Sequence, residues 1–157
     1  MQSNTSMHAR HIMTREVICV NPETLLFEAQ RLMELHKVRH LPVLRGTQLV
    51  GILSDRDLLR AERDIAAGQK PENGPIGTSM TPIPVTATAS ATVSQLAGLM
   101  IEWRIDSVPI VTARGDLAGL VTSTDLLQLL RDDEQHGKLI PFRFEVLHAE
   151  PKRADVA

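Results

Sequence analysis

Two copies of one short pattern hold the residues best suited to chemistry. Each copy reads Gly-x-x-(Ser/Thr)-x-x-Asp, once from Gly51 to Asp57 and once from Gly119 to Asp125. A hydroxyl followed three residues later by a carboxylate is typical of a helix start, where the hydroxyl caps the helix and the acid lies in its first turn. The same position attracts phosphate, because free N–H groups and the helix dipole both favour an anion. The pattern therefore indicates two ordinary helix caps, two anion-binding helix starts, or both.

Other reactive side chains form no catalytic or metal-binding pattern. His36 and His40 are four residues apart, which suits a metal site only on a continuous helix, whereas Val38 to Leu44 reads as a strand. Cys19 lies in a β-branched run without an ordered histidine partner, so we expect a small buried strand residue. The sequence has no Ser-His-Asp order, glycine-rich phosphate loop or paired-carboxylate motif. We expect neither catalysis nor a bound metal.

Length and composition narrow the class of protein. With 157 residues the chain can bury a core without metals or disulfides, and that core must be aliphatic because the only aromatic residues are three Phe and one Trp. Its 17 basic and 19 acidic residues include no basic block, so nucleic acid is not expected as the main partner. No apolar run approaches the ~20 residues that span a bilayer. The single cysteine and the polar start of the chain favour a cytoplasmic setting.

The chain is an internal repeat, because residues 13 to 58 align with residues 80 to 126 when one residue is inserted. Met13-Thr14 aligns with Met80-Thr81 at the start of each copy. The same offset aligns the apolar-Pro-apolar runs and then the two Gly-x-x-(Ser/Thr)-x-x-Asp patterns. So many landmarks in one order indicate two copies of one structural unit.

Each copy reads as strand, helix, strand, strand, helix. In the first copy we expect a strand at Val17 to Val20, a helix capped by Asn21, a hairpin from Leu41 to Leu53, and a helix at Asp55 to Ala67 that ends at Gly68. In the second copy the corresponding expectations are a cap at Thr88, a hairpin from Val108 to Val121, and a helix at Ser123 to His136 that ends at Gly137.

One copy leaves a sheet face poorly covered, so the two should pack about a pseudo-twofold axis. The predicted fold is a mixed α/β (α+β) arrangement of two βαββα motifs. We expect a flexible segment at residues 1–10, motifs at 11–68 and 77–137, a linker at 69–76, and a partly strand-like tail at 138–157.

These residues resemble the tandem CBS-domain pair, or Bateman module, over residues 11 to 137. The resemblance rests on the doubled Met-Thr start, on Leu41-Pro42-Val43 and Val108-Pro109-Ile110, and on the two Gly-x-x-(Ser/Thr)-x-x-Asp patterns. It implies a regulatory module whose central cleft binds AMP, ADP, ATP, NAD or S-adenosylmethionine, with AMP or ATP expected first. It further implies that the module signals to a partner protein and requires no cofactor.

The resemblance also implies which residues bind the nucleotide. Asp57 and Asp125 would hold ribose hydroxyls, Ser54 and Thr122 would lie near phosphate, and the segments around Thr14 and Thr81 would border the adenine. The full set of candidate ligand-binding residues is Thr14, Val17, Ile18, Arg39, His40, Leu41, Pro42, Ser54, Arg56, Asp57, Thr81, Ile83, Val85, Asp106, Ser107, Val108, Pro109, Thr122, Thr124 and Asp125.

The two copies differ in charge. Arg39, His40 and Arg56 accompany the first pattern, whereas the matching residues of the second copy are Asp106, Ser107 and Thr124. We therefore expect the first site to be the primary one for an anionic ligand. The alternatives are that these basic residues are solvated surface charges, or that Arg56 serves a phosphate held by the second motif.

The C-terminal tail and the regulatory function both imply a protein partner. Residues 139–147 alternate like a strand and contain two of the three Phe residues, so we expect them to pack within a homodimer; the alternative is a tail folded over its own module. An effector protein must receive the signal. The alternative function is a structural or dimerisation module whose cleft holds no ligand.

Overall fold

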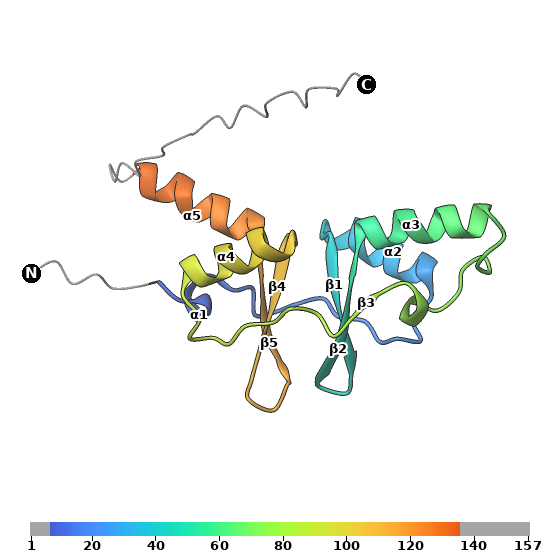
Figure 1. Cartoon of the computed structure of the whole chain (residues 1–157), viewed down its shortest axis with the longest axis horizontal. Coiled ribbons are helices and arrows are strands. Elements are labelled where there is room, and N and C mark those ends of the chain that lie inside the picture. The colour runs from blue at the N-terminus through green and yellow to red at the C-terminus, as the bar shows by residue number, and fades with distance from the viewer. Residues whose placement is uncertain (1–6, 136–157) are drawn as a thin grey trace, which may run out of the picture.

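The computed structural model describes residues 7–135 (Figure 1). Gly137 and the predicted strand-like tail therefore lie outside the described residues. The elements are α1 Ala9–Ile12, α2 Leu26–His36, β1 His40–Arg45, β2 Gln48–Ser54, α3 Asp55–Ala66, the 3-10 helix η1 Ile76–Thr78, β3 Thr81–Pro82, α4 Val93–Trp103, β4 Ser107–Val111, β5 Leu117–Thr122 and α5 Ser123–Gln135.

The predicted mixed fold of two similar motifs is confirmed. In Figure 1 the β1–β2 hairpin with α2 and α3 lies beside the β4–β5 hairpin with α4 and α5, and the two hairpins run side by side. Leu41 and Val43 are fully buried in one core, as are Val108 and Ile110 in the other, because both faces of these apolar strands are covered. At the hairpin tips Thr47 Oγ1 donates to Asp116 Oδ1 at 2.6 Å, which ties the motifs together.

Each hairpin pairs with a segment from the start of the other repeat, which forms a third strand in the first motif and an isolated bridge in the second. β3 pairs antiparallel with β2 through Thr81 and Ile52. At the equivalent place Thr14 and Leu120 exchange two backbone hydrogen bonds of 2.9 Å. The start of each repeat therefore crosses onto the hairpin of the other.

Because of this exchange, two segments contain a core residue that was not expected there. Ala9 belongs to the supposedly flexible residues 1–10, yet it is fully buried in the core of the second motif. Ile76 lies in the supposed linker and is fully buried in the core of the first motif. Ala9 and Ile76 are therefore packed, because each supplies an apolar side chain to the core of the motif beside it.

The expected strand at Val17 to Val20 is reduced to a single parallel bridge between Val20 and Val43. The chain leaves Thr14 on the second motif and reaches Val20 on the first, so the residues between them must span the two motifs. Residues 15–19 are therefore in no strand. The equivalent bridge in the second copy joins Ala87 and Ile110.

Both expected caps of the first helix in each motif were wrong. Asn21 Oδ1 accepts from the Glu23 and Thr24 amides and forms a turn, whereas α2 begins only at Leu26. The N-cap residue of α2, Leu25, forms no side-chain cap bond, and the Phe27 amide in the first turn instead donates to Asn73 Oδ1 at 2.8 Å. In the second motif the cap of α4 is Thr92 rather than Thr88.

The crossing segments explain the glycine in each doubled pattern. A Cβ at Gly119 would lie 2.8 Å from both Met13 Sδ and Thr14 O, and one at Gly51 would lie 2.5 Å from Met80 Sδ. Contacts this short are not tolerated without movement of the neighbouring atoms. Glycine at these positions therefore lets the Met-Thr segment lie directly on the hairpin.

We predict that Gly119→Ala lowers the free energy of unfolding by about 1–3 kcal/mol, because the new methyl group must displace the backbone of Thr14. Urea denaturation followed by circular dichroism measures the change. Gly98→Ala is the matched control, since a Cβ there meets no atom within 4 Å on α4 and should raise stability by up to about 1 kcal/mol. Equal stability of Gly119→Ala and the native protein would show that the crossing segment is not tightly packed.

Candidate functional site

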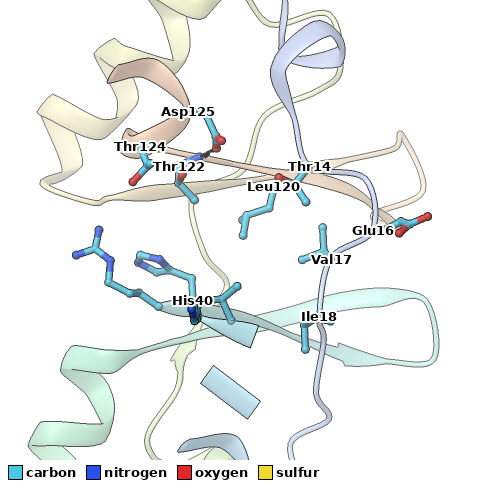
Figure 2. Close-up of a pocket in the computed structure, with 12 residues that line it drawn as sticks. Thr14, Glu16, Val17, Ile18, His40, Leu120, Thr122, Thr124 and Asp125 are labelled. Carbon is cyan, nitrogen blue, oxygen red and sulfur yellow. Dashed lines mark hydrogen bonds between the residues drawn. The ribbon is translucent and has the colours of Figure 1, made fainter. Parts of the chain in front are cut away.

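Two clefts lie between the motifs, each containing one aspartate of the doubled pattern. The Asp125 cleft has a volume of about 250 Å³ (Figure 2). Its lining residues are Thr14, Glu16, Val17, Ile18, Lys37, Val38, Arg39, His40, Leu120, Thr122, Thr124 and Asp125. The Asp57 cleft has a volume of about 380 Å³. Its lining residues are His40, Ile52, Ser54, Arg56, Asp57, Arg60, Thr81, Ile83, Pro84, Val85, Trp103, Arg104, Ile105, Asp106 and Ser107.

Each cleft is assembled from both motifs. In Figure 2 Thr122, Thr124 and Asp125 lie on one side of the Asp125 cleft, with Val17, Ile18 and His40 on the other. The first group opens α5, while the second comes from the extended N-terminal segment and the start of β1. The Asp57 cleft repeats this arrangement with the motifs exchanged. The crossing of the Met-Thr segments thus decides which residues meet.

Both aspartates stabilise the start of a helix by accepting hydrogen bonds from the residue before it. Asp57 Oδ2 accepts from Ser54 N at 2.9 Å and Ser54 Oγ at 2.8 Å, and Asp125 Oδ2 accepts from Thr122 N at 2.7 Å and Thr122 Oγ1 at 2.8 Å. These bonds hold each carboxylate in one orientation. They leave Oδ1 as the oxygen that can face a ligand.

The second oxygen differs between the clefts. Asp57 is 6% exposed, and its Oδ1 forms an ion pair with Arg60 Nη1 at 3.4 Å. Asp125 is partly exposed, and within residues 7–135 its Oδ1 has no hydrogen-bond partner. The Asp125 carboxylate is therefore the more accessible acceptor.

The distribution of charge differs from the expectation that Arg39, His40 and Arg56 all accompany Asp57. Arg39 lines the Asp125 cleft together with Lys37, because the loop before β1 faces the other motif. Arg56 does lie in the Asp57 cleft, but its guanidinium is 2.9 Å from Asp106 Oδ2 and forms an ion pair across the two motifs. Basic groups are thus divided between the clefts.

His40 lines both clefts and occupies the position between them. Burial lowers the pKa of His40, Asp55 and Asp106 oppose this decrease, and Arg39 and Arg56 add to it. A neutral imidazole is therefore favoured near neutral pH. The neutral ring has one donor and one acceptor nitrogen, and either cleft can use them.

Four predicted site residues line neither cleft. Leu41, Pro42, Val108 and Pro109 are fully buried in β1 and β4. The residues before them, His40 and Ser107, begin those strands and do line a cleft. Beyond the first residue each strand enters the core, so its side chains contact other apolar groups instead of solvent.

The clefts also contain residues that sequence reasoning missed. The most informative are Lys37 and Arg104, which end α2 and α4 in the left-handed conformation with φ 53°. Their place beside Arg39 and Asp106 in the aligned repeats could have identified them. Trp103 is another such residue, since it is 58% exposed and lines the Asp57 cleft.

The remaining reactive groups lie elsewhere. Cys19 is half-buried, its thiol donates to Val17 O at 3.3 Å, and burial raises the pKa of the thiol, which disfavours the reactive thiolate. α2 ends at His36 and β1 begins at His40, so the two imidazoles do not share a helix face. Among residues 7–135 no three His, Cys, Asp or Glu side chains gather as a metal site would require. No described helix is both long and apolar enough to cross a membrane.

The fold and clefts define a two-motif module in which each site is shared between the motifs. The CBS domain family model matches residues 9–64 and 75–132, and the chain belongs to this family. The resemblance inferred from the doubled pattern is therefore confirmed.

Solved structures and a curated relative support this assignment. CBSX2, solved in complex with AMP, is 28% identical with a TM-score of 0.73, over 82% of this chain and 98% of that chain. The CBS domain pair of protein MJ0100, solved with 5′-methylthioadenosine and S-adenosyl-L-methionine, is 25% identical with a TM-score of 0.73 and the same coverage. Inosine-5′-monophosphate dehydrogenase of Korarchaeum cryptofilum is 36% identical over 75% of this chain, which spans only 23% of that enzyme.

We predict that His40 makes the protein less stable in mild acid. Burial places the folded-state pKa below the ordinary value of about 6.5, so as the pH falls below 6.5 the unfolded chain binds the proton first. The contribution of His40 to stability is thus retained above pH 6.5 and lost below it. Urea denaturation at pH 7.5 and 5.5 should show a larger decrease for the native protein than for His40→Gln. An identical decrease in both proteins would contradict the assignment.

Proposed function

We propose that this chain is a regulatory module that binds an adenosine-containing nucleotide in the clefts between its CBS motifs and signals to a partner protein. The observation that carries the proposal is the composition of the Asp125 cleft: an accessible carboxylate, a helix N-terminus, an apolar wall and two cationic side chains. Relatives of the same fold that were solved with AMP or with S-adenosyl-L-methionine support the ligand class.

Each part of a nucleotide has a matching group in the Asp125 cleft. Asp125 Oδ1 can accept hydrogen bonds from a ribose diol. Val17, Ile18 and Leu120 supply apolar surface for the adenine. Thr122 and Thr124 at the start of α5, with Arg39 opposite, suit a phosphate because the helix dipole and the guanidinium both favour an anion.

We propose that the Asp125 cleft is the primary site, which reverses the ranking drawn from sequence. The Asp57 cleft is larger, but its carboxylate is engaged with Arg60 and its Arg56 with Asp106, which leaves Arg104 as a lining cation outside these two pairs. A ligand that binds Asp57 or Arg56 must replace an existing ion pair, whereas Asp125 Oδ1 loses no partner among residues 7–135 when it binds. The accessible acceptor in the Asp125 cleft therefore outweighs the larger volume of the Asp57 cleft.

A dimerisation module is the second candidate function. It is favoured by large apolar side chains exposed on the outer helices, including Phe27 at 61% and Leu35 at 74% on α2, and Ile101 at 79% on α4. Burial of these side chains would supply a homodimer interface. A homodimer is compatible with nucleotide binding, since Phe27, Leu35 and Ile101 line neither cleft.

We further propose that the module is not itself an enzyme and works in a reducing cytoplasm. No described side chain is arranged as an activated nucleophile, and the raised pKa of the Cys19 thiol disfavours its thiolate. A lone cysteine fits a compartment in which thiols remain reduced.

A thermal-shift screen tests the ligand class. AMP, ADP, ATP, NAD and S-adenosylmethionine are compared with GTP as the control. An adenosine ligand present at 100 times its dissociation constant should stabilise the protein by about 2.7 kcal/mol, because it binds only the folded state. Selective shifts support the proposal. An unchanged midpoint with all of them at millimolar concentration leaves dimerisation as the better account.

We predict that Asp125→Asn weakens AMP binding about tenfold or more and exceeds the effect of Asp57→Asn. Loss of charged hydrogen bonds to the ribose accounts for that magnitude. The two substitutions are matched, because each alters the cap of an equivalent helix. Calorimetry gives the total binding, and fluorescence of Trp103, the only tryptophan, follows the Asp57 cleft. A larger effect of Asp57→Asn would restore the ranking drawn from sequence.

A further inference from the structure

In the loop before β4, Asp106 lines one cleft and is hydrogen-bonded to the helix that opens the other. The Asp106 side chain lines the Asp57 cleft. Its backbone carbonyl accepts a hydrogen bond of 2.9 Å from the amide of Ser123, the first residue of α5. Ser123 lies between Thr122 and Thr124, which line the Asp125 cleft. Asp106 thus faces one cleft with its side chain and holds the helix start of the other with its backbone.

The first motif repeats this arrangement. The Arg39 side chain lines the Asp125 cleft, and its carbonyl accepts a hydrogen bond of 3.0 Å from the amide of Asp55, the first residue of α3. The next residue, His40, lines both clefts. Each of the two loops therefore connects a ligand-facing side chain to the helix that opens the opposite site.

Among the ion pairs of residues 7–135, one fixes the loop before β4 and none fixes the loop before β1. Arg56, the second residue of α3, contacts Asp106 Oδ2 at 2.9 Å, and the Asp106 side chain is 33% exposed. The residues that correspond to Arg56 and Asp106 in the other cleft are Thr124 and Arg39, which cannot form an ion pair. The Arg56–Asp106 pair therefore joins the start of α3 to the loop that holds the start of α5, with no counterpart across the pseudo-twofold axis.

We propose that Asp106 is a positioning residue for both clefts and that the Arg56–Asp106 pair makes their occupancies antagonistic; the inference rests on the proposed nucleotide-binding function. A phosphate in the Asp57 cleft competes with Asp106 for Arg56. Once released, the loop holds the Ser123 amide less firmly, and the helix start that faces phosphate in the Asp125 cleft is less well ordered. By linkage, a ligand in the Asp125 cleft weakens binding in the Asp57 cleft by the same factor.

Two single substitutions separate this coupling from simple charge effects. Asp106→Asn removes a negative charge and Arg56→Gln removes a positive one, so a purely coulombic influence on bound AMP has opposite signs in the two variants. Loss of the ion pair has the same sign in both. We expect each variant to bind AMP in the Asp125 cleft about fivefold more weakly or worse, the lower end of typical coupling between sites.

The backbone amide resonance of Glu16 reports this binding, because Glu16 lines only the Asp125 cleft. Hydrogen exchange of the Ser123 amide provides a second readout that needs no ligand, and exchange should be faster in both variants. Asp116→Asn is the matched control, since Asp116 also joins the motifs through hydrogen bonds but lies outside both clefts. It should alter neither the AMP affinity nor the exchange of Ser123.

The possible outcomes test the coupling and the proposed nucleotide binding separately. If the native protein binds AMP and both variants bind it equally well, or with changes of opposite sign, the coupling is overturned and the proposed function stands. The same holds if Asp116→Asn has as large an effect, because general loosening of the motifs then explains the result. If the native protein binds no AMP in either cleft, the proposed function with AMP as ligand and the coupling both fail.

Discussion

The rest of the structure depends on the crossing of each Met-Thr segment onto the hairpin of the other motif. The crossing brings Thr14 against Leu120 and Thr81 against Ile52, and it requires glycine where the segment touches the hairpin. It also brings Ala9 into the core of the second motif and Ile76 into the core of the first. Neither motif has a complete core alone, so folding of one depends on residues of the other.

The same crossing makes the clefts joint products of both motifs. Because the halves are exchanged, each doubled pattern faces the extended segment and the basic or acidic loop of the opposite copy. Divergence between the copies then gives unequal sites: Lys37 and Arg39 face Asp125, whereas Asp106 and Arg56 neutralise each other beside Asp57. The two motifs thereby have clefts of different charge although their folds are the same.

Helix capping and ligand recognition are compatible uses of one carboxylate. In both motifs Oδ2 is held by the amide and hydroxyl of the capping residue, which fixes the orientation of the side chain before any ligand arrives. A preordered acceptor loses little conformational entropy on binding. The occupancy of Oδ1, by Arg60 in one motif and by no described residue in the other, then distinguishes the sites.

The sequence by itself determined the repeat, the mixed fold, the hairpins and both late helices, because these follow from local spacing and hydrophobic periodicity. It placed Arg39 beside Asp57, and it missed that Asn73 accepts a hydrogen bond from the first turn of α2 and that Leu41 and Val108 enter the core. Only the tertiary structure decided these points. Packing between residues far apart in the chain decides which segment crosses to which motif. Local sequence patterns do not predict that exchange.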